Sequence, residues 1–221
     1  MNMKARLFFA ALVATTTMAG VSNASVDERY AELQMVPEAI NDPDPLMRLA
    51  QLEAIIAEGD ATKVQLALRT AFTVDDPNIR SLALRAHFAK YDTVVIDAEY
   101  PEGLEEALKR GAEDRKLVAT AQVLDGVGRQ FSLLTRYESL SQVEMPFISL
   151  NNNPNRDERI SGSGNIRGTT ITFAGEIRFS GGNSTTCSFE LSRYEGFVVH
   201  GFGSCNRPEG TVPFPVSLRL F

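Results

Sequence analysis

The segment Asp44-Pro-Leu-Met-Arg-Leu-Ala-Gln-Leu-Glu-Ala-Ile-Ile-Ala57 recurs 32 residues later as Asp76-Pro-Asn-Ile-Arg-Ser-Leu-Ala-Leu-Arg-Ala-His-Phe-Ala89. Six of the fourteen aligned positions are identical. Each copy starts with an acid that can cap a helix, followed by proline at the first helical position, where its missing N–H is not needed. Between the copies, Asp60-Ala-Thr62 starts another segment with helical apolar spacing. Because one helical hairpin cannot cover its own apolar face, this recurrence predicts a helical repeat.

The spacing Asp-Pro-x-[Met/Ile]-Arg-x-x-x-Leu-x-Ala resembles HEAT-like repeats, over two units within about residues 41–110. In that family the recurring Asp and Arg help to hold successive repeats in register, and Asp44 with Arg48 and Asp76 with Arg80 match those positions. The resemblance implies a helical stack that binds another protein on its concave face. A plain helical bundle with one coincidental match is the alternative that the sequence leaves open.

The start of the chain has the features of a secretory signal. Lys4 and Arg6 precede the apolar run of residues 7–14, and small residues follow up to Ala24. A run of this length is too short for a bilayer, which takes roughly 20 residues to span. We therefore expect cleavage between Ala24 and Ser25, no transmembrane segment after cleavage, and a bacterial product that is periplasmic or secreted.

Beyond Gly128 the apolar residues recur with a period of two. Phe131 and Leu133 alternate with polar neighbours, and the pattern returns in several later segments up to the C-terminus. Short alternating strands separated by glycines predict an antiparallel β sandwich or small barrel. The two cysteines, Cys187 and Cys205, favour a structural disulfide in an oxidising compartment, since antiparallel pairing between them places both on one sheet face.

These patterns predict an α+β chain in two parts. After a signal peptide of residues 1–24, we expect a helical domain of residues 25–127 and an all-β domain of residues 128–221 with one disulfide. Residues 25–125 carry 20 acids and 11 bases, whereas residues 126–221 carry 8 acids and 9 bases. A net acidic chain without a basic stripe is a poor nucleic-acid binder, so no nucleic acid is expected among its partners.

Motifs for catalysis are weak throughout the chain. His87 lies beside Phe88 and is expected in packing or at the surface, and His200 is expected to face solvent from a strand. The chain has no Gly-x-Ser-x-Gly elbow and no phosphate-binding loop. Residues 151–157 have the alternating spacing of a calcium loop, but Arg156 stands where that loop needs glycine. We therefore predict no catalytic residues, no metal site and no cofactor.

Arg193, Tyr194, His200 and Arg207 form a candidate binding patch, because arginine and aromatic side chains recur at binding surfaces. With the repeat-like half, this patch favours an exported non-enzymatic binding or scaffold protein whose partner is another envelope or secreted protein. The alternative is an envelope hydrolase, or an inhibitor of one, acting on cell-wall or polysaccharide material. A deep polar cleft with converging acids would favour the enzyme, and a flat or convex β surface would favour binding.

Overall fold

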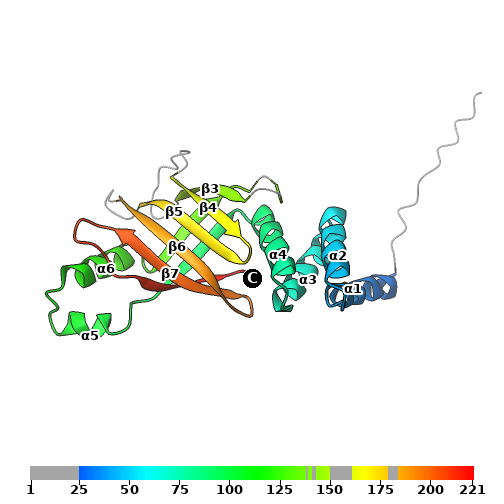
Figure 1. Cartoon of the computed structure of the whole chain (residues 1–221), viewed down its shortest axis with the longest axis horizontal. Helices are drawn as coiled ribbons and strands as arrows, with labels where there is room; N and C mark the ends of the chain where they lie inside the picture. Colours follow the sequence, from blue (N-terminus) through cyan, green and yellow to red (C-terminus); the bar gives the residue numbers. More distant parts are fainter. Residues whose placement is uncertain (1–24, 138, 141–142, 150–160, 179–183) are drawn as a thin grey trace, which may run out of the picture.

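The computed structural model describes residues 25–137, 139–140, 143–149, 161–178 and 184–221. A stack of four helices precedes an eight-stranded β part, and two further helices lie between the first two strands (Figure 1). The elements are α1 (Val26–Ile40), α2 (Pro45–Glu58), α3 (Ala61–Thr73), α4 (Pro77–Lys90), β1 (Thr93–Ala98), α5 (Leu104–Lys109), α6 (Arg115–Gly126), β2 (Gln130–Thr135), β3 (Glu144–Ser149), β4 (Gly162–Arg167), β5 (Thr170–Arg178), β6 (Ser184–Glu195), β7 (Val198–Asn206) and β8 (Phe214–Arg219).

Side-chain caps begin the four helices of the stack. Ser25 and Glu28 form a capping box at α1, each accepting a hydrogen bond from the backbone N–H of the other. Asp44, Asp60 and Asp76 accept hydrogen bonds from the first amides of α2, α3 and α4. The acid–proline pairs therefore begin helices at the two positions that the repeat predicted.

The first helix contains a proline in its last turn, because α1 continues past Pro37 to Ile40. Proline in the last turn removes only one backbone hydrogen bond, and the backbone after it keeps its hydrogen-bond partners. The backbone N–H of Asn41 donates to the Pro37 carbonyl at 3.0 Å, and the Asn41 side-chain amide donates to the same oxygen at 2.8 Å. The extra turn places Ile40 in the core with no exposed surface.

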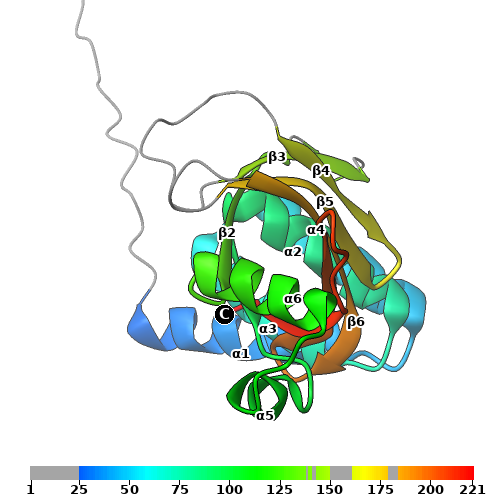
Figure 2. The ribbon, with the colours of Figure 1, turned by 90° about the vertical axis from the view of Figure 1, so that its left-hand side faces the viewer.

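The strands form a closed antiparallel barrel in which each strand pairs with its neighbour in sequence and β1 pairs with β8. Of the two expected β architectures, the small barrel is therefore right and the sandwich is wrong. Ile96 of β1 stands opposite both Phe131 of β2 and Leu218 of β8, which closes the ring. Figure 2 shows α6 across the end of the barrel that faces away from the helical stack.

The barrel begins earlier in the chain than expected. We predicted a helical domain of residues 25–127, whereas Thr93–Ala98 forms β1 and pairs on both edges with strands of the barrel. The helices α5 and α6 occur where helices were expected, yet they belong to the end of the barrel. The backbone N–H of Val212 donates to the buried Thr120 hydroxyl of α6 at 2.9 Å, which ties α6 to the chain before β8.

Phenylalanine rings pack against one another inside the barrel. The Phe131 ring lies 4.8 Å from the Phe189 ring and 6.0 Å from the Phe214 ring, measured between centroids. The rings of Phe147 and Phe173 lie 5.8 Å apart, edge to face. These five side chains are at most 2% exposed. Rings from strands on different sides of the barrel meet at its axis, so side chains pack its interior as in other eight-stranded barrels.

Glycines on the inward face make room for these rings. A Cβ atom on Gly164 would lie 2.8 Å from the Phe173 ring, and one on Gly203 would lie 2.5 Å from the Phe214 ring. Alternation of large and small inward residues is how small barrels fill their interiors without strain. We expected glycines between the strands, but Gly164 and Gly203 lie within β4 and β7, where they serve packing.

Candidate functional site

A largely buried ion pair joins α2 to the start of α4 in the helical stack. Arg48 Nη2 of α2 lies 2.7 Å from Asp76 Oδ2, and the Asp76 side chain is only 8% exposed. Asp76 also caps α4, since its other carboxylate oxygen accepts from the amides of Asn78 and Ile79. The hydrogen bond from Arg48 lowers the pKa of the Asp76 carboxyl. One carboxylate thus begins α4 and holds α2 against it.

Arg80 repeats the local contact of Arg48 but meets the barrel instead of another repeat. Arg48 Nη1 donates to the Asp42 carbonyl at 2.9 Å, and Arg80 Nη2 donates to the Val74 carbonyl at 3.0 Å. The two donating arginines are 32 residues apart in the sequence, and so are the two accepting carbonyls. Where Arg48 reaches the next repeat, the Arg80 guanidinium lies over the Tyr194 ring, 4.9 Å from its centroid. The barrel therefore stands where a further helical unit would follow.

The helices α1 and α3 are linked in a similar way. Arg29 of α1 donates through Nη2 to both carboxylate oxygens of Asp60, at 2.8 and 2.7 Å. This contact and the backbone amide of Lys63 lower the pKa of Asp60 to about 2. One arginine-to-cap ion pair thus connects α1 with α3, and another connects α2 with α4.

An aromatic junction packs the helical stack on the barrel. The ring of the C-terminal residue, Phe221, lies 5.9 Å from the Phe72 ring and 5.2 Å from the His87 ring. Arg69 places its guanidinium 5.1 Å from the same phenylalanine ring. His87 is 7% exposed, and its Nδ1 atom is buried without a hydrogen-bond partner among the described residues. His87 is therefore a packing residue, one of the two positions expected for it.

Acid should loosen this junction through His87. Burial, with a smaller contribution from the Lys90 charge, lowers the pKa of His87 from 6.5 to about 4. The unfolded chain takes up the proton near pH 6.5 and the folded chain only near pH 4. The contribution of neutral His87 to the free energy of unfolding is therefore fully present above pH 6.5 and is lost as the pH falls towards 4. We expect His87 to account for a loss of roughly 3 kcal/mol across this window. Urea unfolding at several pH values should show a shallower dependence for His87→Phe; an unchanged dependence would exclude His87 as its source.

The outer face of β6, β7 and β8 carries a hollow of about 470 Å³. At this place a β-bulge shifts the pairing of β6 and β7 between Leu191 and Arg193. The exposed Phe202 ring lies at the hollow, and His200 Nε2 lies 3.1 Å from Glu195 Oε2 nearby. The lining residues are Glu190, Ser192, Arg193, His200, Gly201, Phe202, Pro215 and Val216.

Two of the four residues predicted as a binding patch line this hollow. Arg193 and His200 stand opposite each other on β6 and β7. Tyr194 instead packs against the core and donates its hydroxyl to the Thr169 carbonyl at 2.6 Å, and burial raises its pKa. Arg207 follows the far end of β7 and does not line the hollow. Phe202 points outward, because inward residues alternate along β7 from the buried Val199.

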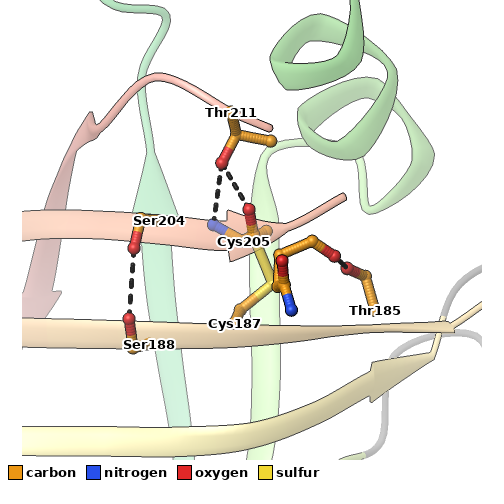
Figure 3. Close-up of a disulfide and its surroundings, with 7 residues drawn as sticks. Thr185, Cys187, Ser188, Ser204, Cys205 and Thr211 are labelled. Atoms are coloured by element: carbon orange, nitrogen blue, oxygen red, sulfur yellow. Dashed lines mark hydrogen bonds between the residues drawn. A yellow bond between two sulfur atoms is a disulfide. The ribbon is translucent and has the colours of Figure 1, made fainter. Parts of the chain in front are cut away.

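The predicted disulfide is confirmed. Cys187 and Cys205 stand directly opposite on β6 and β7, and the bonded side chains are buried inside the barrel (Figure 3). The Thr211 hydroxyl donates to the carbonyl of Cys205 and accepts from the backbone N–H of Cys205 at 3.2 Å. On the opposite face of the same strands, the hydroxyls of Ser188 and Ser204 lie 3.1 Å apart. A disulfide of this kind indicates an oxidising compartment outside the cytoplasm.

Metal-binding clusters and membrane-spanning helices are absent from the part of the chain that the structure describes. Residues 25–137, 139–140, 143–149, 161–178 and 184–221 contain no group of three or more His, Cys, Asp or Glu side chains that could hold a metal ion. Over the same ranges, no helix has the length and apolar character needed to cross a membrane. The candidate calcium loop at residues 151–157 lies outside the described residues.

Comparisons with protein-family models, curated proteins and solved structures found no match to this chain. Three features of the described residues bear on function: the ion pairs of the helical stack, the aromatic junction, and the hollow on the barrel.

Proposed function

We propose that this protein is an exported, non-enzymatic binding or scaffold protein of the bacterial cell envelope. Its helical stack is HEAT-like in this proposal, and it binds another envelope or secreted protein. The observation that carries the proposal is the contact between Arg48 and Asp76, because it joins one helical unit to the next at the spacing of the sequence repeat. Stacks of this kind present extended surfaces that suit protein partners.

Two features support export to the periplasm or the medium. The disulfide between Cys187 and Cys205 indicates an oxidising compartment. In addition, α1 begins with its cap at Ser25, so cleavage between Ala24 and Ser25 leaves the capping contact with Glu28 in the mature protein. The proposed cut thus falls directly before the cap of α1.

The hollow on the barrel favours a second candidate, an inhibitor of an envelope hydrolase or a hydrolase acting on polysaccharide. Phe202 presents an exposed ring beside Glu190 and Arg193, and a ring flanked by polar groups is a common setting for sugar or peptide binding. In this candidate the barrel, rather than the helical stack, makes the functional contact.

Site-specific photo-crosslinking in the native host tests the proposal. A benzoylphenylalanine replaces Met35, an exposed residue of α1, or Phe202 at the hollow; a third position, Lys109 on α5, is equally exposed and serves as the control. We expect a discrete protein adduct from Met35, at a yield about fivefold or more above that from Lys109. An adduct from Phe202 alone would favour the second candidate. No protein adduct from either position would rule out the proposal.

A further inference from the structure

One face of α2 is apolar and exposed at the outer end of the helical stack. Leu46 is 76% exposed and Met47 is 46% exposed. Helical spacing continues this face through three alanines, Ala50, Ala54 and Ala57, all of them exposed. The face lies opposite the buried side of α2, and Figure 1 shows α2 at the end of the stack that is remote from the barrel. No described element packs on this face.

Part of the equivalent face of α4 is covered. With the offset of 32 residues, Met47 corresponds to Ile79, which is fully buried, and Ala54 corresponds to Ala86, which is 5% exposed. Leu82, the equivalent of Ala50, is half-buried, whereas Asn78 and Ala89, the equivalents of Leu46 and Ala57, are exposed. This side of α4 is turned away from the barrel, because Phe88, on the opposite side of the helix, packs on Phe173 of β5, with 6.2 Å between the ring centroids. The helix α2 packs against α4 there (Figure 1). The exposed face of α2 is therefore the surface that a preceding helical unit would cover.

The same comparison of α2 with α4 gives the charge that a partner must carry. Asp44 begins α2 as Asp76 begins α4, and its Oδ1 atom accepts from the Leu46 amide at 2.9 Å. Within the described ranges no arginine reaches Asp44, whereas Asp76 binds Arg48. Residues 25–60 contain nine acids and two bases, so the end of the stack is strongly acidic. An arginine of a partner would give Asp44 the ion pair that Asp76 forms with Arg48.

We propose that this end of the stack docks a basic amphipathic helix of a partner protein, which adds to the array as one more unit. The helix lays an apolar stripe on Leu46, Met47 and the three alanines, whose small side chains allow close approach. It places an arginine on Asp44 as Arg48 lies on Asp76. A second copy of this chain is a poor occupant, because it presents the same acids and like charges repel. This inference rests on the proposed function and names its surface and partner class.

A synthetic peptide provides the probe. It has the sequence of residues 42–59, which carries the face of α2 that covers α4, with both aspartates replaced by asparagine and both glutamates by lysine. We expect saturable 1:1 binding to the mature protein, residues 25–221, by fluorescence anisotropy at low salt, and weaker binding as the salt concentration rises.

In the protein, Ala54→Glu should raise the Kd at least about tenfold, since it places a buried charge under the helix. Asp44→Asn should raise the Kd about fivefold, because asparagine keeps the helix cap but loses the charge.

Ala89→Glu is the matched control, because Ala89 is exposed in α4 at the position equivalent to Ala57. It should leave the Kd unchanged. Absence of saturable binding, or equal binding to Ala54→Glu and the unmodified protein, would overturn the inference. So would a mature protein that dimerises in sedimentation experiments through this face, with Ala54→Glu restoring the monomer. If the peptide fails while Met35 still forms its adduct, the docking inference falls and the proposed function stands.

Discussion

Replacing both cysteines, Cys187→Ala together with Cys205→Ala, is expected to lower the free energy of unfolding by about 4 kcal/mol. The disulfide closes a loop with a sequence separation of 18, and removing that restraint from the unfolded chain costs about 3 kcal/mol in the chain-entropy model. Loss of two buried sulfur atoms adds about 1 kcal/mol. In a protein of this size the melting temperature should fall by roughly 8–16 °C, measured by calorimetry. The helical circular-dichroism signal below the transition should be largely retained.

The matched control uses the same two strands. Ser188→Ala with Ser204→Ala removes the exposed hydroxyl contact on the outer face, and such a contact contributes at most about 1 kcal/mol. Reduction of the unmodified protein should reproduce most of the effect of the cysteine variant. A cysteine variant as stable as the serine variant would show that the disulfide contributes little to the barrel.

The variant Asp76→Ala is expected to lose about 4 kcal/mol of unfolding free energy. It removes the cap of α4, for about 1 kcal/mol. It also leaves the Arg48 guanidinium, which is 16% exposed, without its partner, for about 3 kcal/mol. Chemical denaturation with urea measures the loss. Asp76→Asn separates the two contributions, because asparagine keeps the cap and removes only the charge.

Asp44→Ala is the internal comparison for this prediction. Asp44 has the same place before the same proline, but it is exposed and no described arginine pairs with it. Its loss should therefore be about 1 kcal/mol, that of a cap alone. Equal losses at Asp44 and Asp76 would contradict the view that the arginine pair holds the two repeats in register.

Local patterns were enough to predict much of this fold. The caps at Asp44, Asp60 and Asp76 depend on residues within one helical turn, and their helices begin where the sequence indicated. The disulfide could be predicted because Cys187 and Cys205 flank a single turn between two strands. In both cases the decisive interactions join residues near in sequence.

Contacts between residues far apart in the chain could not be predicted from the sequence. Thr93–Ala98 alternates buried and exposed residues, but its six residues follow a helix, and its partners on β8 lie about 120 residues away. The same limit applies to Arg80, whose contact with Tyr194 depends on how the barrel docks on the stack. At the hollow, Arg193 and His200 were found from residue type, whereas the shape around them depends on a bulge that no short motif announces.

The pairing of β1 with β8 has a consequence for biogenesis. A chain made from its N-terminus contains β1 long before it contains β8, because the paired residues lie about 120 positions apart. Until β8 is made, β1 has one open edge, and such edges are prone to intermolecular pairing. The barrel therefore closes only after β8 has been made, and until then the earlier strands need protection, which fast hairpin formation along the chain can give.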